Sequence, residues 1–244
     1  MRTSLVRRAV LTASAASLGL LAAACTGSGQ GGAEADAKPS VSTPAPAPTP
    51  EAKALGPAEL EKLTLADGDV AKVKIEKAGA DDVAKAAEVT TDKQECRPLA
   101  EAGGLAPVGK AVTTTERIGT GAPTDPANPM SITLTSVQLA SYDAKGAEES
   151  LASMKAAGQA CAGGFTTTVK GEKTVVKSVG PAALTAGDDA ASWAFTAESD
   201  GETLKSQMVA FRKGNNLVVI HSFQFTGKPA LPQAFVDAQL KKLG

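Results

Sequence analysis

The chain has 244 residues, with 25 lysines and arginines against 26 aspartates and glutamates and a formal net charge of −1. Because it contains no block of basic residues, this balance argues against nucleic acid or an anionic membrane surface as a binding partner. A single histidine excludes most metal sites and most serine–histidine triads unless that residue, His221, takes part.

The N-terminal residues have the pattern of an export signal. Three arginines and no acidic residue precede an apolar stretch at 9–24, which is shorter than the roughly 20 residues that a helix needs to cross a bilayer. The stretch ends at Cys25, and Leu-Ala-Ala-Ala-Cys at 21–25 is similar to a bacterial lipobox, in which the cysteine receives a diacylglycerol and the chain is cut just before it. The sequence therefore predicts a lipoprotein signal peptide at 1–24.

Lipidation at Cys25 would decide where the protein resides. Two or more acyl chains, such as palmitate, give stable membrane anchoring, so we expect the mature protein on the outer face of the cytoplasmic membrane, tethered to it by lipid. The alternative is an ordinary secretory signal with an incidental cysteine. Because the pair Arg7-Arg8 fits a twin-arginine export pattern, Sec and Tat export both stay open.

Composition divides the exported part in two. From Cys25 to residue 55 the chain is rich in Gly, Ser, Ala and Pro and cannot bury enough apolar surface to offset its conformational entropy, which predicts a disordered tether. Residues 56–244 are enough for one globular domain with its own core. All of the aromatic residues lie at or after Tyr142, so the first half of this domain has to be packed with aliphatic side chains.

The first half of the domain predicts three strands and a short helix. Apolar and charged residues alternate at 72–76, as in a half-buried strand. A short helix is expected to begin at Cys96, and strands rich in Thr, Val, Ile and Leu are expected at 111–118 and 131–139.

A longer helix is expected next, and it carries a cysteine. Asp143 is its predicted N-cap, and apolar residues spaced through 143–161 form a buried face that turns Cys161 inward. With the lipidation cysteine set aside, Cys96 and Cys161 form an even pair in an exported chain, which favours one disulfide. A metal site or a redox pair lacks support because the sequence has no CxxC pattern.

Two turn signals align the last strands. After a strand at 174–179, strands at 190–198 and 203–212 form a hairpin around Asp200-Gly201. The residues predicted to face each other are Ala191 with Ala210, Trp193 with Met208, Phe195 with Ser206, and Ala197 with Leu204. A second turn at Gly214-Asn215 adds a third strand. It pairs Met208 with His221, Ala210 with Val219, Ser206 with Phe223, and Leu204 with Phe225.

Both turns put the same apolar residues on one face of the sheet, which makes the register more credible. Near the second turn the reverse face is also apolar, through Val209, Phe211, Val218 and Ile220, so that end of the sheet is either covered on both sides or open as a groove. An amphipathic helix is expected at 231–243. The sequence predicts an α+β domain: a mainly antiparallel twisted sheet of about six to seven strands, with two or three helices packed on one face.

Several segments together resemble a known group of proteins. The lipobox, Leu-Thr-Leu-Ala-Asp at 63–67, Cys-Arg-Pro-Leu-Ala at 96–100, the helix ending at Cys161 and the stretch 209–219 are similar in spacing to actinobacterial surface lipoproteins related to the extracellular sensor domain of mycobacterial-type serine/threonine kinases. The resemblance implies a ligand-binding or sensing module without catalytic residues. The kinase sensors have a second disulfide, which this chain cannot form.

No motif of a catalytic, metal or cofactor site is found: HExxH, GxSxG, SxxK and the P-loop are all missing from the sequence. We therefore predict no catalytic residues, no metal and no cofactor. His221 is expected to be a hydrogen-bonded core or cavity histidine rather than a catalytic or pH-sensing one. The residues predicted to form either a filled core face or an apolar pocket are Trp193, Phe195, Met208, His221 and Phe223.

The leading hypothesis is a non-enzymatic cell-surface lipoprotein with a sensor-like or ligand-binding extracytoplasmic domain. Its partners would be the membrane, through the lipid anchor, and either a small hydrophobic ligand or a cell-envelope protein. One alternative is a carrier or chaperone of a lipid or other hydrophobic molecule, which needs several hundred cubic ångströms of continuous apolar space. Another is an unrecognised hydrolase, which needs polar groups that converge on His221.

Overall fold

The computed structural model describes residues 53–184, 186, 189–199, 201–224, 227, 229 and 232–244. The predictions for the signal peptide, for Cys25, for the tether as far as residue 52, for Asp200 and for Phe225 lie outside these residues. The helices and strands, in chain order, are α1 (Pro57–Leu63), β1 (Val73–Lys77), β2 (Val89–Thr91), α2 (Arg97–Gly103), β3 (Thr113–Gly121), β4 (Thr133–Ser141), α3 (Gly146–Ala160), β5 (Phe165–Val169), β6 (Glu172–Pro181), β7 (Ala190–Ser199), β8 (Glu202–Lys213), β9 (Asn216–Gln224) and α4 (Gln233–Leu243).

The strands form one antiparallel sheet in the order β1-β3-β4-β9-β8-β7-β6-β5-β2. The described residues thus contain nine strands, more than the predicted six to seven, in an α+β arrangement with four α-helices. β1 and β2 are consecutive in the sequence but lie at opposite edges. Residues 78–88, which we call the crossing segment, connect these two edges.

The crossing segment requires the sheet to curl. In a flat sheet the eight gaps between neighbouring strands, at about 4.8 Å each, would separate the two edges by about 38 Å. The segment would span about 39 Å only if it were fully extended, but it contains a turn at Gly79–Asp82 and a 3₁₀ helix at Ala86–Glu88. The sheet is therefore curved so that its edges approach each other on one side.

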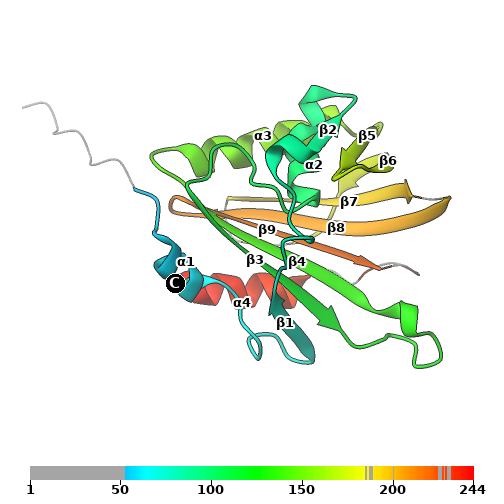
Figure 1. Ribbon diagram of the computed structural model, residues 1–244, viewed down its shortest axis with the longest axis horizontal. Coiled ribbons are helices and arrows are strands. Elements are labelled where there is room, and N and C mark those ends of the chain that lie inside the picture. Colours follow the sequence, from blue (N-terminus) through cyan, green and yellow to red (C-terminus); the bar gives the residue numbers. More distant parts are fainter. Residues whose placement is uncertain are drawn as a thin grey trace, which may run out of the picture. The chain divides into compact units, whose positions relative to one another are not determined.

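Helices cover both faces of the sheet (Figure 1). On one face, α2 and α3 pack with the disulfide on a first core that includes Leu99, Leu151 and Met154. On the other face, α1 and α4 pack on a second core that includes Leu60 and Val236. The prediction of helices on one face only is therefore wrong. The physical reason is the apolar reverse face of β8 and β9, which needs its own cover.

Both predicted turns of the last three strands give the predicted register. β7 pairs with β8 as Ala191 with Ala210, Trp193 with Met208, Phe195 with Ser206, and Ala197 with Leu204. β8 pairs with β9 as Met208 with His221, Ala210 with Val219, and Ser206 with Phe223. Val209 and Ile220 belong to the second core, so this end of the sheet is covered on both sides.

Three short elements, α1, β2 and β5, were not expected from the sequence. β5 and β6 are joined by Lys170-Gly171, where both residues have positive φ angles of 52° and 90°. This two-residue turn lacks the Asn or Asp that makes such hairpins recognisable. β2 has only three residues and is a strand because it pairs with β5.

The helix predicted from Asp143 begins later, at Gly146. Asp143 does not cap it, because its Oδ1 accepts a hydrogen bond from the backbone N of Ala54 at 2.8 Å. The backbone N of Leu55 donates to Ser141 Oγ, and Asn215 Nδ2 donates to the carbonyl O of Lys53. These bonds attach residues 53–55 to the domain just before α1.

The predicted disulfide between Cys96 and Cys161 is confirmed. Cys96 is the N-cap of α2 and Cys161 is the C-cap of α3, and both are fully buried in the first core. The bond closes 65 residues, which in the chain-entropy account stabilises the fold by about 4 kcal/mol. It holds the beginning of α2 against the end of α3.

Close packing of α3 on the sheet can be tested at Gly158. A Cβ at this position would overlap the indole Nε1 of Trp193. We expect Gly158→Ala to lower the free energy of unfolding by roughly 1–2 kcal/mol, because overpacking costs more than the about 1 kcal/mol that alanine contributes to a helix. Urea denaturation followed by Trp193 fluorescence measures the effect. Gly163→Ala, where an added Cβ meets nothing within 4 Å, is the control and should leave stability unchanged.

Candidate functional site

The predicted apolar face divides into a filled part and an open part. Trp193, Phe195 and Met208 are buried and belong to the first core. His221 and Phe223, near the end of β9, are half-buried and line a cleft. Trp193, Phe195 and Met208 therefore form part of a filled core, whereas His221 and Phe223 line a pocket.

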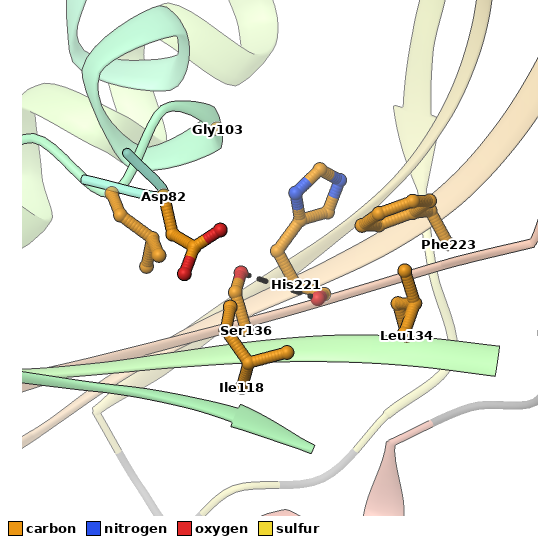
Figure 2. Close-up of a pocket in the computed structure, with 8 residues that line it drawn as sticks. Asp82, Gly103, Ile118, Leu134, Ser136, His221 and Phe223 are labelled. Atoms are coloured by element: carbon orange, nitrogen blue, oxygen red, sulfur yellow. Dashed lines mark hydrogen bonds between the residues drawn. The ribbon is translucent and has the colours of Figure 1, made fainter. Parts of the chain in front are cut away.

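The cleft has a volume of about 230 Å³. It lies on the same side of the sheet as α2, and Figure 2 shows its side chains rising from the strands toward Asp82 and the loop at Gly103. The residues that line it are Ile118 of β3, Leu134 and Ser136 of β4, His221 and Phe223 of β9, Asp82 of the crossing segment, and Gly103 and Leu105 at the end of α2.

Register explains why the floor of the cleft gathers these residues. β4 pairs Ser136 with His221 and Leu134 with Phe223, and β3 pairs Ile118 with Ser136. Residues directly opposite on neighbouring strands point to the same face of a sheet. Three strands thus supply one contiguous, mostly apolar floor with a serine and an imidazole in it.

His221 combines burial with missing hydrogen bonds. Its Nε2 atom is buried and has no hydrogen-bond partner among the described residues, although the residue as a whole retains some solvent contact. The imidazole lies edge-on to Phe195, with ring centroids 6.1 Å apart, and is 6.2 Å from the Phe223 ring. Burial lowers the pKa of His221 from its ordinary 6.5 to about 4. The imidazole is therefore neutral near pH 7.

His221 lines the cleft, and its Nε2 atom has no hydrogen-bond partner among the described residues. The reason lies in the neighbours. Ser136 Oγ donates to the backbone carbonyl O of His221 at 3.4 Å, and Asp82 Oδ2 accepts from the backbone N of Gly79 at 2.8 Å. Both polar side chains thus bond to backbone groups rather than to the ring.

A serine, a histidine and an aspartate nevertheless share the cleft, which bears on the hydrolase hypothesis. A triad requires hydrogen bonds from the nucleophile to the imidazole and from the imidazole to the carboxylate. The described contacts contain neither bond. A pKa of about 4 also makes His221 a weak base near neutral pH.

The size of the cleft bears on the carrier hypothesis. Ligand cavities for drug-sized molecules measure about 300–1,000 Å³, and the 230 Å³ found here is below that range.

No three His, Cys, Asp or Glu side chains in the described part of the chain gather as a metal site would require. Among the described helices, none is long and apolar enough to span a bilayer.

Most of the cleft could not be found from the sequence. Asp82, Leu105 and Ile118 lie in three segments that meet only through the sheet order and the crossing segment. His221 and Phe223 were found from the predicted register of β9, whereas Ser136 gave no signal, because β4 contains several other polar residues.

Comparisons with known proteins give a likeness of fold. No protein-family model matches the sequence, and no curated protein sequence matches it. The structure is similar to the crystal structure of the extracellular domain of PknH from Mycobacterium tuberculosis, with a TM-score of 0.53 and 15% sequence identity. The match covers 78% of this chain and 97% of that chain. The predicted resemblance to a kinase extracellular domain is thereby confirmed at the level of the fold.

The lowered pKa of His221 predicts a pH dependence of stability. The unfolded chain binds the proton below about pH 6.5 and the folded chain only below about pH 4, so this group stabilises the fold fully above pH 6.5. The free energy of unfolding therefore falls by up to roughly 3 kcal/mol as the pH drops from 6.5 to 4. Urea denaturation at several pH values should show a shallower decline for His221→Phe. Parallel declines in the two proteins would show that the buried imidazole is not responsible.

Proposed function

We propose that this protein is a lipid-anchored, extracytoplasmic binding module of the sensor type. It acts without catalysis, by taking a small ligand into the cleft between β4, β9 and the crossing segment. Cys25 carries the anchor, and the Gly/Ser/Pro-rich stretch after it serves as a tether that holds the domain away from the lipid. The domain lies on the outer face of the cytoplasmic membrane.

One observation carries the binding role: the sheet surface around His221 is only partly covered, whereas the same surface around Trp193 and Met208 is filled. A buried, unpartnered nitrogen beside an apolar floor costs free energy in the unliganded protein. Such a cost is tolerated at functional sites more often than elsewhere. The disulfide and the likeness to the extracellular domain of PknH are both compatible with a module that works outside the cytoplasm.

The anchor is tested by Cys25→Ser. We expect the wild-type chain to be recovered in the membrane fraction, with acyl chains on an N-terminal cysteine, because two or more chains give stable anchoring. The variant should lose the acyl mass and keep residues 1–24, because the cut before position 25 depends on the lipidated cysteine. Mass spectrometry of the intact protein measures both effects. A wild-type chain without acyl mass, or a variant with the same mature N-terminus as wild type, would overturn the lipoprotein assignment.

The binding site is tested with a library of small ring-containing compounds, since the cleft volume suits one ring with a short side chain. Binding compounds should shift the imidazole signals of His221, the single histidine, in NMR spectra. Ser136→Leu, which fills space at the cleft floor, should raise the dissociation constants of the binding compounds at least tenfold. Thr196→Leu, on the opposite face of the sheet and outside the lining residues, is the matched control.

Two outcomes would contradict the proposed function. One is that no compound shifts the His221 signals, or that Ser136→Leu leaves every affinity unchanged. The other is covalent labelling of Ser136 by a fluorophosphonate, since that reagent reacts with activated serines and would favour the hydrolase.

A further inference from the structure

We propose that the cleft selects a small organic cation: an ammonium group carried on an apolar body about the size of one ring. This inference rests on the proposed function and names the class of ligand for the same site. It follows from three features of the cleft, namely its charge, the hydrogen bonding of Asp82 and the shape of its floor.

The charge of the cleft is negative. Among the described lining residues, Asp82 alone carries a full charge at neutral pH, because the imidazole of His221 is neutral. Glu116 lies two residues before Ile118 on the same face of β3, and its Oε1 atom is buried without a hydrogen-bond partner among the described residues. Gly103, the last residue of α2, lies at the rim and adds no charge.

Two lysines on neighbouring elements have partners outside the lining residues. Lys74 pairs with Glu76 at 2.9 Å on β1. Lys170 Nζ donates to the backbone carbonyls of Ala80 and Asp81, outside the set of lining residues. Among the described residues that line the cleft, none is a lysine or an arginine.

Asp82 is oriented by its own turn. Its Oδ2 accepts from the backbone N of Gly79, and its backbone N donates to the carbonyl O of Gly79 at 3.1 Å. The turn is fixed at both sides, because Ala78 N donates to Glu116 O and Ala84 N donates to Gly104 O. One carboxylate oxygen is thus used to hold the side chain in place. The other can receive a donor from a ligand without further ordering, which favours affinity.

The floor suits the apolar part of such a ligand. Ile118, Leu134 and Phe223 line the cleft opposite Asp82 (Figure 2), and an aromatic ring beside an ammonium adds a cation–π attraction. The volume of about 230 Å³ equals roughly eight water molecules at about 30 Å³ each. This space fits one ring with a short chain.

The inference is tested with three probes of equal shape: 2-phenylethylammonium, 2-phenylethanol and phenylacetate. Each is titrated into the exported chain carrying Cys25→Ser, and the imidazole signals of His221 report binding by NMR. We expect the ammonium to bind at least tenfold more tightly than the alcohol, since a hydrogen bond to a charged group is stronger than a neutral one. Phenylacetate should bind more weakly still.

Two variants assign the preference to one carboxylate. Asp82→Asn keeps an oxygen that can accept from Gly79 N, so the turn is preserved, but it removes the charge. With this variant, the dissociation constant of the ammonium should be within twofold of that of the alcohol. Asp81→Asn removes the neighbouring exposed charge, which is not a lining group. The dissociation constant of the ammonium should then stay within twofold of its wild-type value.

The other results would overturn the inference. If the alcohol or phenylacetate binds as tightly as the ammonium, or if Asp82→Asn keeps the tenfold preference, the ligand class is wrong while the binding role of the cleft stands. If no probe shifts the His221 signals with a dissociation constant below about 10 mM, the cation inference is overturned. The compound library and Ser136→Leu then decide separately whether the cleft binds anything.

Discussion

Burial of both faces of the central strands is the constraint on which this structure depends. In β9 every residue from Asn216 to Ile220 is buried, with Leu217 and Val219 in the first core and Val218 and Ile220 in the second. Because successive side chains of a strand point to opposite faces, such a strand needs an apolar layer on each side. The chain supplies α2 and α3 for one face and α1 and α4 for the other (Figure 1).

The cleft exists because this cover ends before the strands do. β9 continues past Val219 to His221 and Phe223, where the first core stops and the crossing segment passes over the sheet instead. A loop supplies fewer apolar side chains than a helix face, so the sheet surface beneath it stays partly open. The unpartnered Nε2 of His221 is a consequence of this change from helical to loop cover.

The disulfide helps to position one wall of the cleft. Cys96 fixes the beginning of α2 to the end of α3, and the other end of α2 forms one wall of the cleft through Gly103 and Leu105. The crossing segment is bonded to the same helix end through Ala84 N and Gly104 O. The wall that carries Asp82 is therefore positioned by a helix that is covalently held in the first core.

The sequence by itself determined what depends on neighbours in the chain. Turn residues set the register of β7, β8 and β9, because a hairpin joins strands that are adjacent in sequence, and the even cysteine pair predicted the disulfide. The tertiary structure alone decided the sheet order, the two-sided helix cover and the meeting of Asp82, Ile118 and His221. These three features depend on contacts between segments that are distant in the sequence, in particular on the connection that crosses the whole sheet. The pattern of neighbouring residues does not indicate which residues such a connection brings together.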